Sequence, residues 1–370
     1  MIALLGRADQ PTDAVRDYCA RLAQALAARG VALELSEVRW ADQGWPKALR
    51  SLWKTSRAWR GRWVLFQHTG LMWSRRGFPV GALVVLRLLK WRGARLGVVF
   101  HDISAKPETH WLQRLRLAHQ YWVMRTASRW AECALLTVPP DQVPWLPRNA
   151  TNAVFVPVGS NFSPPPAAPD IIPRQRGGPA IAAFCITGGA RAFSEAADIA
   201  YAAKRVAGQM GLARLVVLGR GSREAEAALR QRLDGAPVEV SVLGLLSPQE
   251  VAEALAGVDV LLFVRGHISS RRSSAIAGIA CGLPVVGYRG AETASPITEA
   301  GVQLVAEGNR AALAEALCRV LTEEPLRQEL RRRSLRAYGQ HFSWEVIAAQ
   351  FLAALGARND EIPCGPQSNA

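Results

Sequence analysis

The sequence lacks an uninterrupted apolar run long enough to span a bilayer. Its longest uncharged apolar stretch, Ala275 to Tyr288, is broken by glycines and by Pro284, whereas a spanning helix needs about 20 consecutive apolar residues. Near the start, Arg7 and Asp9 fall where a signal peptide requires an apolar core. We therefore expect a cytoplasmic protein that is soluble or peripheral to the inner membrane.

Cysteine is scarce and shows no metal-binding or redox pattern. The six cysteines are isolated and include no Cys-x-x-Cys pair, the spacing typical of zinc and thioredoxin-type sites. The sequence has no Asp-x-Asp pair either. We therefore expect reduced, mostly buried thiols and no bound metal ion.

Acidic residues are few in the first half of the chain. Residues 1–160 hold 23 Lys and Arg against 10 Asp and Glu, a net charge of +13, whereas the remaining residues carry +2. Eleven of the twelve tryptophans lie between Trp40 and Trp145. Indole rings favour the boundary of a bilayer, and cations favour anionic headgroups. This combination predicts contact with an anionic membrane surface. The alternatives are a solvated basic face over core tryptophans, and nucleic-acid binding.

Two segments concentrate these side chains. Residues 45–60 are expected to form a helix with an apolar and a cationic face, and residues 109–131 a longer basic helix. The apolar side chains are Leu49, Leu52, Trp53 and Trp59 in the first and Trp111, Trp122 and Trp130 in the second. Either helix can instead pack its tryptophans into the core.

Strand-like and helix-like segments alternate along the chain, which is typical of parallel sheets covered by helices on both faces. A proline-rich stretch separates two such series. We predict an α/β fold of two Rossmann-like α/β/α domains that face each other across a cleft. The predicted parts are an N-terminal domain at 1–160, a linker at 161–179, a C-terminal domain at 180–342, a helix at 343–357 that crosses back to the N-terminal domain, and a flexible tail at 358–370.

Glycines and arginines follow several predicted strands of the second domain. Ligands of such sheets bind beyond the carboxyl ends of the strands, so these loops form the candidate binding site. Glycine lets backbone N–H groups approach a phosphate, and arginine and serine side chains complete an anion site. The strongest signal is the run 269–274, which has two arginines and four serines directly before an apolar helix. A capped, solvated turn is the alternative for this run.

The segment Ala280-Cys281-Gly282-Leu283-Pro284-Val285-Val286 resembles the sequence after the donor-binding helix in the retaining, GT-B glycosyltransferases of family four, the group 1 type. Leu218–Gly221, Val258–Leu262 and Val156–Asn161 resemble the same family. The resemblance implies transfer of a sugar from a nucleotide-diphosphate sugar, with retention of the anomeric configuration and without a metal ion or other cofactor. Together with the basic first domain, it implies a lipid-linked or membrane glycan acceptor in polysaccharide or glycolipid assembly.

The resemblance also implies roles for individual residues. His101 and Asp102 are the implied catalytic pair, since a histidine at this place in the family contacts the donor sugar; a strand-terminal capping pair is the alternative. The implied acceptor side holds Gly6, Arg7, Asp9 and His68. The donor nucleotide sugar is expected to bind Gly188, Gly189, Arg191, Arg220, Gly244, Leu245, Leu246, Arg265, Ser269, Arg271, Arg272, Ser273 and Ser274.

The donor loop departs from the family in one respect. The family has a Glu-x7-Glu pattern there, and the matching positions in this chain are Ser269 and Ala277. Loss of both carboxylates beside Arg271 and Arg272 leaves the site more cationic, which favours a diphosphate. Because both carboxylates of the family pattern are missing, the alternative function is a catalytically inactive binding or scaffold protein in a glycan assembly system. Nucleic acid is not an expected partner, since no nucleic-acid-binding module is recognisable.

Overall fold

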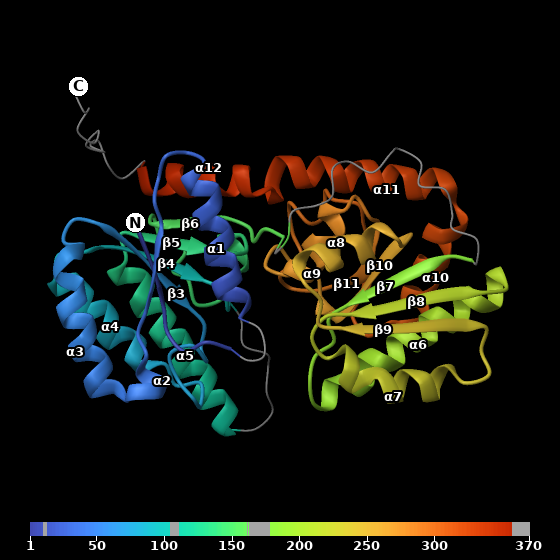
Figure 1. The fold of residues 1–370 in the computed structure, drawn as a ribbon, viewed down its shortest axis with the longest axis horizontal. Helices are drawn as coiled ribbons and strands as arrows, with labels where there is room; N and C mark the ends of the chain where they lie inside the picture. Colours follow the sequence, from blue (N-terminus) through green and yellow to red (C-terminus); the bar gives the residue numbers. More distant parts are fainter. Residues whose placement is uncertain (10–12, 104–110, 161, 163–177, 357–370) are drawn as a thin grey trace. The chain divides into compact units, whose positions relative to one another are not determined.

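The computed structural model describes residues 1–9, 13–103, 111–160, 162 and 178–356. The start of the predicted helix at 109–131, most of the predicted linker and the predicted tail lie outside these residues. The chain divides into two compact units, both drawn in Figure 1. Unit 1 comprises Met1–Pro157 with Trp344–Ala370, and unit 2 comprises Val158–Ser343.

Unit 1 is built on a six-stranded parallel sheet in the order β2-β1-β3-β4-β5-β6. Its strands are β1 (Ile2–Leu5), β2 (Glu34–Glu37), β3 (Trp63–His68), β4 (Arg95–Phe100), β5 (Cys133–Leu136) and β6 (Ala153–Phe155). Every residue of β1, β3 and β5 is buried, as expected for strands that helices cover on both faces.

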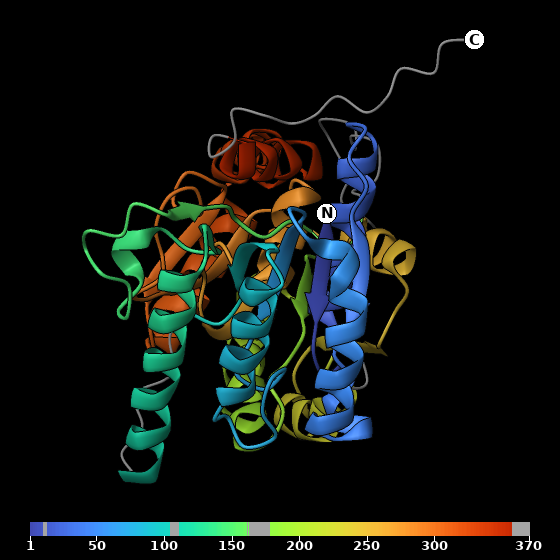
Figure 2. The same ribbon diagram turned by 90° about the vertical axis from the view of Figure 1, so that its left-hand side faces the viewer.

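Helices cover both faces of this sheet. They are α1 (Ala14–Ala27), α2 (Trp40–Gln43), α3 (Trp45–Thr55), α4 (Val80–Trp91), α5 (Trp111–Trp130) and α12 (Trp344–Gly356). The right-handed crossovers after β2, β3 and β4 place α3, α4 and α5 on one face. Figure 2 shows these three helices side by side. The crossover from β1 to β2, which contains α1, runs in the opposite direction along the sheet, and α1 packs against α12.

Local interactions set the ends of two helices of unit 1. The carboxylate of Asp13 caps α1 by accepting hydrogen bonds from the backbone N–H groups of Val15 and Arg16, which satisfies donors that the first turn leaves free. α3 ends at Thr55, and a 3-10 turn at Ser56–Trp59 replaces the last turn of the predicted helix. Leu52 and Trp59 are buried. Part of this apolar face therefore packs into the core, as the alternative interpretation proposed.

Unit 2 contains a second six-stranded parallel sheet, in the order β12-β11-β10-β7-β8-β9. Its strands are β7 (Ala180–Phe184), β8 (Ala213–Leu218), β9 (Val238–Gly244), β10 (Val260–His267), β11 (Val285–Arg289) and β12 (Val302–Ala306). β12 and β6 were not expected from the sequence. Both are short edge strands with mostly half-buried residues, so they lack the continuous apolar pattern of the central strands.

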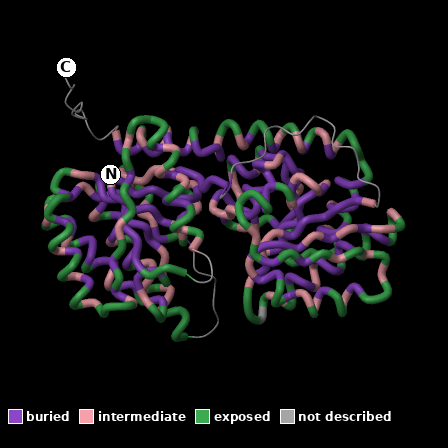
Figure 3. The backbone as a smooth tube through the Cα atoms, viewed as in Figure 1, coloured by how far each residue is buried: buried purple, intermediate pink, exposed green. Residues whose placement is uncertain are grey.

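The helices of unit 2 are α6 (Ala190–Met210), α7 (Ser222–Leu233), α8 (Pro248–Ala256), α9 (Ser273–Ala280), α10 (Arg310–Thr322) and α11 (Glu324–Ala337). α6 packs against α7 and α10, and α9 contacts α11. Sheet residues such as Ile181 and Leu215 form a core with Ile199 of α6 and Leu317 of α10. Figure 3 shows the buried strands of both units. The predicted α/β class with two Rossmann-like units is confirmed.

Within the described ranges, no helix combines the length and the apolar character needed to cross a membrane.

Candidate functional site

Each sheet has one place where neighbouring crossovers run in opposite directions. This switch point lies between β7 and β10 in unit 2 and between β1 and β3 in unit 1. Loops at the carboxyl ends of such strands diverge and leave room for a ligand. The predicted donor residues all lie at the carboxyl edge of the unit 2 sheet, and the predicted catalytic and acceptor-side residues lie at that of unit 1.

The chain leaves β7 through a glycine pair and enters α6. Gly189 is the cap residue of α6, with φ 71°, and no described side chain caps the helix. A Cβ atom at Gly188 or Gly189 would have no described atom within 4 Å, so the space around this turn is open. Buried Glu195 holds the loop by accepting a hydrogen bond from Thr187 N–H (2.7 Å). An open helix start of this kind favours an anion, and exposed Arg191 lies in its first turn.

The turn after β8 packs tightly against the end of β7. The carbonyl oxygen of Arg220 accepts a hydrogen bond from Ile186 N–H (2.8 Å). A Cβ atom at Gly221, which has φ 79°, would lie only 2.2 Å from the carbonyl oxygen of Ile186. Both the conformation and the lack of space therefore require glycine at 221. This packing fixes the backbone of Arg220 at the switch-point edge.

The charges of two arginines act on the cysteine that follows β7. Cys185 has φ 65°, which is uncommon for a residue with a Cβ atom. Burial raises the pKa of its thiol, and the positive charges of Arg265, near the end of β10, and Arg220 oppose that rise. Within the described part of the chain, Nε of Arg265 has no hydrogen-bond partner. The switch point of unit 2 therefore carries cationic groups that an anion can bind.

A carboxylate that sequence reasoning missed binds the serine and arginine run before α9. Glu292 follows β11 and is 2% exposed. Its carboxylate accepts hydrogen bonds from Arg271 Nε (2.6 Å) and Nη2 (3.1 Å) and from the Ser269 hydroxyl (3.3 Å). His267 Nε2 lies 3.5 Å from the same carboxylate. The expectation of a more cationic loop is therefore wrong at Arg271, because Glu292 offsets its charge.

The start of α9 points backbone donors toward the same edge. Arg272 is the cap residue, and its side chain does not cap the helix. Ser273 is half-buried and Ser274 is buried. The N-terminus of a helix carries partial positive charge, so this turn also favours an anion.

The end of β9 adds an apolar element to the edge. Gly244 ends the strand at φ 77°, and its carbonyl oxygen accepts a hydrogen bond from Gly219 N–H (2.7 Å). Leu245 is 51% exposed, and Leu246 is half-buried. An exposed leucine beside a cationic edge gives a planar base an apolar surface to cover.

The edge of unit 1 begins with a close approach of two loops. A Cβ atom at Gly6 would lie 2.6 Å from the carbonyl oxygen of Met72, so glycine lets the chain after β1 pass beside the loop after β3. Arg7 N–H donates a hydrogen bond to the same oxygen (2.9 Å). Arg7 and Asp9 are exposed.

His101 follows β4 and is held by Gln67 of β3. The Gln67 amide donates a hydrogen bond to the Leu65 carbonyl (3.1 Å), which directs Gln67 Oε1 toward His101 Nε2 (2.8 Å). An amide oxygen only accepts hydrogen bonds, so Nε2 carries the proton and Nδ1 keeps its lone pair. The Tyr18 ring packs edge-on against the imidazole at 5.0 Å. Burial lowers the pKa of His101 to about 4. The imidazole is therefore neutral at pH 7, and Nδ1 can accept a hydrogen bond from a hydroxyl group.

His68 and Asp102 line a cavity of about 210 Å³ beside α5. Burial lowers the pKa of His68 to about 4, and neither ring nitrogen has a hydrogen-bond partner among the described residues. Asp102 Oδ2 accepts a hydrogen bond from Gly70 N–H (3.2 Å). Leu71 and Met124 complete the apolar part of the lining. A neutral imidazole and a carboxylate beside apolar side chains suit a sugar.

The structure thus gathers the predicted residues in two groups, one in each unit. Sequence reasoning missed Gln67, Cys185 and Glu292. A signal existed for Gln67, which is a polar residue inside the otherwise apolar strand before His68. Nothing in the sequence marked Glu292, which lies in a loop 21 residues after Arg271.

Metal and disulfide chemistry can be assessed only for the described residues. Among them, no three His, Cys, Asp or Glu side chains cluster in a way that could hold a metal ion. Their five cysteines form no disulfide. Burial raises the pKa of Cys281 to about 12, so its thiol is neutral and a poor nucleophile at pH 7.

Residues 185–323, which contain most of the carboxyl edge of unit 2, match the family described as Glycosyl transferases group 1. A GDP-mannose-dependent alpha-(1-6)-phosphatidylinositol dimannoside mannosyltransferase from Mycobacterium tuberculosis is 34% identical over 154 residues, which are 41% of this chain and 38% of that protein. The chain therefore spans well under half the length of the curated relatives it matches.

Solved structures resemble this chain over nearly its whole length. Anabaena HepE in complex with UDP and glucose has a TM-score of 0.64 at 13% identity and covers 96% of this chain and 99% of its own. Sucrose-phosphate synthase from Thermosynechococcus elongatus has a TM-score of 0.66 at 20% identity and covers 95% and 96%. At these identities the likeness shows the fold alone. The predicted GT-B fold is confirmed, and so is the resemblance to group 1 glycosyltransferases over residues 185–323.

Proposed function

We propose that this protein is a glycosyltransferase that moves a sugar from a nucleoside-diphosphate sugar to a lipid-linked or other membrane glycan acceptor, in glycolipid or polysaccharide assembly. The observation that carries the proposal is the placement of two cationic residues, Arg220 after β8 and Arg265 near the end of β10, at the carboxyl edge that flanks the β7–β10 switch point, together with the open turn at Gly188–Gly189. This edge lies within the segment that matches the glycosyltransferase family. Fixed cations and backbone N–H groups stabilise a diphosphate most strongly as it departs with the bonding electrons.

The side chains of each unit suggest how the reaction is divided. The bond between the anomeric carbon and the diphosphate breaks, and the diphosphate keeps the bonding electrons. The oxygen of the acceptor hydroxyl bonds to that carbon on the same face and passes its proton to the departing diphosphate, which retains the configuration. The arginines of unit 2 take the place of a divalent cation, so we propose a metal-independent reaction. In unit 1, neutral His101 accepts a hydrogen bond from a sugar hydroxyl at Nδ1. The cavity lined by His68 and Asp102 receives the acceptor sugar.

The similar proteins support the choice of substrate classes. The mycobacterial relative is named for GDP-mannose and for phosphatidylinositol dimannoside, and HepE was solved with UDP and glucose. We therefore propose a guanosine or uridine diphosphate sugar as donor and a glycolipid as acceptor. We place the reaction at the cytoplasmic face of the inner membrane, with unit 1 on an anionic lipid surface and without a nucleic-acid partner.

A thermal-shift panel with GDP-mannose, UDP-glucose and UDP-galactose tests the donor. A ligand that binds only the folded state raises Tm, so one nucleotide sugar is expected to give a clear rise. The Arg220→Ala, Arg265→Ala double variant is expected to lose that rise while its Tm without ligand stays unchanged. A flat panel contradicts the proposal. If transfer of labelled sugar to lipid extract stops when EDTA is added, the result contradicts the metal-independent reaction.

A binding protein without turnover is the second candidate. It is favoured by the pairing of Arg271 with Glu292 and by the absence of carboxylates at 269 and 277. Calorimetric binding of a nucleotide sugar, with no release of nucleoside diphosphate in the presence of membrane lipid extract, would select this candidate.

A further inference from the structure

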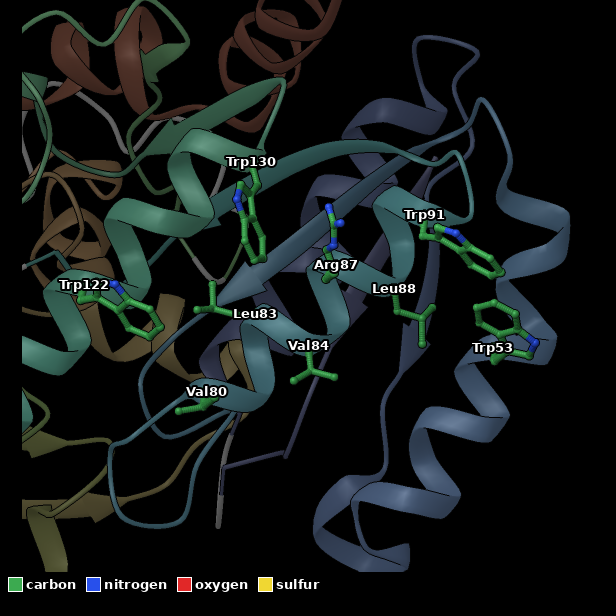
Figure 4. A pocket seen from close by; sticks show the side chains of 9 residues that line it. All are labelled: Trp53, Val80, Leu83, Val84, Arg87, Leu88, Trp91, Trp122 and Trp130. Atoms are coloured by element: carbon green, nitrogen blue, oxygen red, sulfur yellow. The ribbon is translucent and has the colours of Figure 1, made fainter.

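An apolar groove of about 630 Å³ lies on unit 1, away from the residues of the proposed site. Figure 4 shows its arrangement. Trp122 and Trp130 of α5 stand on one side, and Trp91 of α4 and Trp53 of α3 stand on the other. Val80, Leu83, Val84 and Leu88 of α4 lie between them. The groove therefore follows the outer side of α4, between its two neighbouring helices.

The groove leaves large apolar side chains in contact with solvent. Trp91 is 68% exposed, Trp122 is 52% exposed and Val84 is 44% exposed. Positions 80, 84, 88 and 91 of α4 fall on one helical face. Core packing explains Trp73 and Trp145, which are fully buried, but it does not explain these side chains. A contiguous exposed apolar surface of this kind marks contact with a partner or a membrane.

The charge of the three helices selects the occupant. Within their bounds, α3, α4 and α5 contain no Asp or Glu and nine Lys or Arg, three in α3, two in α4 and four in α5. Arg87 lines the groove itself. At one end, Trp53 stacks on Trp91 at 4.4 Å, and the Arg92 guanidinium lies over the Trp53 ring at 4.3 Å.

An anionic bilayer offers both chemistries that this surface requires. Its headgroups attract the cations, its interface accommodates indole rings, and its hydrocarbon chains fill apolar grooves. The three helices that carry these residues lie side by side on one face of the unit 1 sheet (Figure 2). An acidic protein surface would complement the charges but would leave the groove without an apolar filling.

We propose that the α3–α4–α5 surface seats unit 1 on an anionic phospholipid bilayer and that a hydrocarbon chain of a lipid enters the groove along α4. The inference rests on the membrane location in the proposed function and adds to it a hydrocarbon-binding site. Binding then has two separable components. The cations supply an attraction that salt screens, and the groove supplies an apolar contact that salt does not weaken.

Vesicle flotation separates the two components. Vesicles of phosphatidylglycerol and phosphatidylcholine are compared at 0.1 and 1 M NaCl, because the Debye length falls to about 3 Å at 1 M. The wild-type protein is expected to bind less at high salt but to remain partly bound. Lipids brominated on their acyl chains are expected to quench its tryptophan fluorescence. Complete release at 1 M NaCl without quenching would overturn the proposal.

Matched variants test the groove directly. Val84→Asp places a charge in the groove and is expected to lower vesicle partitioning about tenfold or more at both salt concentrations. Leu335→Asp in α11 of unit 2, at a site with the similar exposure of 43%, is the control and is expected to bind as the wild type does. Arg87→Gln is expected to weaken binding mainly at low salt. Circular dichroism verifies that each variant is folded.

The remaining outcomes also decide the proposal. Wild-type binding by Val84→Asp contradicts it. A second outcome also contradicts the proposal: the wild type binds no vesicles, light scattering shows a dimer, and Val84→Asp dissociates that dimer. The groove would then contact a second copy of the chain. The thermal shift with a nucleotide sugar is read on the same variants. A retained shift with lost vesicle binding in Val84→Asp supports both proposals, whereas vesicle binding without any shift in the wild type contradicts the proposed donor alone.

Discussion

Each of the two units is built on a six-stranded parallel sheet with a switch point, yet different side chains lie at the carboxyl edges of the two sheets. The edge of unit 2 presents two cations, Arg220 and Arg265, whose charges act on the half-buried Cys185 thiol. The edge of unit 1 presents two imidazoles, His68 and His101, whose pKa values burial lowers to about 4. Fixed cations suit a diphosphate, and neutral hydrogen-bonding groups suit sugar hydroxyls. A few side chains at strand ends, rather than the architecture, therefore set what each unit can bind.

The units also differ in their tryptophans, which gives unit 1 a spectroscopic signal of its own. All twelve tryptophans lie in unit 1, eleven between Trp40 and Trp145 and the last at Trp344 in α12. Intrinsic fluorescence therefore reports unfolding of unit 1, whereas far-ultraviolet circular dichroism reports both units. The comparison between the units can thus be tested on the intact chain.

Removing the cations of unit 2 should have the largest effect. The Arg220→Ala, Arg265→Ala double variant is expected to lower kcat about a thousandfold, because a fixed donor to a developing anion contributes about 10²–10³. Release of nucleoside diphosphate measures the rate. The control is Lys204→Ala, which removes an exposed cation of α6 that lies outside the proposed site and is expected to leave kcat unchanged. Equal losses of kcat in the two variants would mean that Arg220 and Arg265 have no specific catalytic importance.

The buried ion pair of unit 2 gives the next largest effect. Glu292→Ala leaves Arg271 without its carboxylate partner and is expected to lower the free energy of unfolding of unit 2 by about 3 kcal/mol. Urea unfolding should show an earlier transition by circular dichroism and an unchanged one by fluorescence. The control is Glu226→Ala, whose exposed pairs with Arg223 and Arg230 contribute about 0–1 kcal/mol. If the fluorescence transition shifted instead, the stabilising effect of the Arg271–Glu292 pair would not be confined to unit 2.

Sequence alone predicted the central elements because their patterns are local. β1 at Ile2–Leu5 is a continuous apolar run, and Asp13 to Gly30 contains both start and stop signals of a helix. Parallel strands place the loops that follow them at one edge, so positions such as Arg220 and His101 could be assigned to the carboxyl edges. The edge strand β6 lacked such a pattern and was missed.

The side-chain partners at the site could not be predicted because they depend on packing. Glu292 meets Arg271 across 21 residues, and Gln67 meets His101 across 34. No periodicity connects such pairs. The charge of Arg271 was therefore overestimated, and the protonation state of His101 could not be assigned. The exposed apolar face of α4 could not be predicted either, because an apolar helical sequence is equally typical of a helix that is fully buried.

The neutral edge of unit 1 should respond to a carboxylate at Gln67. His101→Ala is expected to lower kcat about a hundredfold, as for loss of a general base or hydrogen-bond acceptor, while the Kd for the nucleoside diphosphate stays unchanged. Gln67→Glu places a negative charge beside Nε2, which favours the imidazolium and raises the pKa of His101. The acid limb of the pH–rate profile should then move to higher pH, whereas Gln67→Leu should not move it in that direction. An unmoved limb in Gln67→Glu would contradict the role of His101.

Acidification should produce the smallest effect and should weaken unit 1 first. The unfolded chain binds a proton at His68 near pH 6.5, whereas the folded chain binds it near pH 4. Stability is therefore complete above the unfolded pKa and falls as the pH drops from about 6.5 toward 4. For His68 the loss between pH 7 and pH 5 is about 2 kcal/mol. The urea midpoint by fluorescence should fall over this range, and His68→Leu should remove the share of His68 while the share of His101, whose pKa burial also lowers to about 4, remains. If fluorescence and circular dichroism showed the same pH slope, the two units would not differ in the way that their edges indicate.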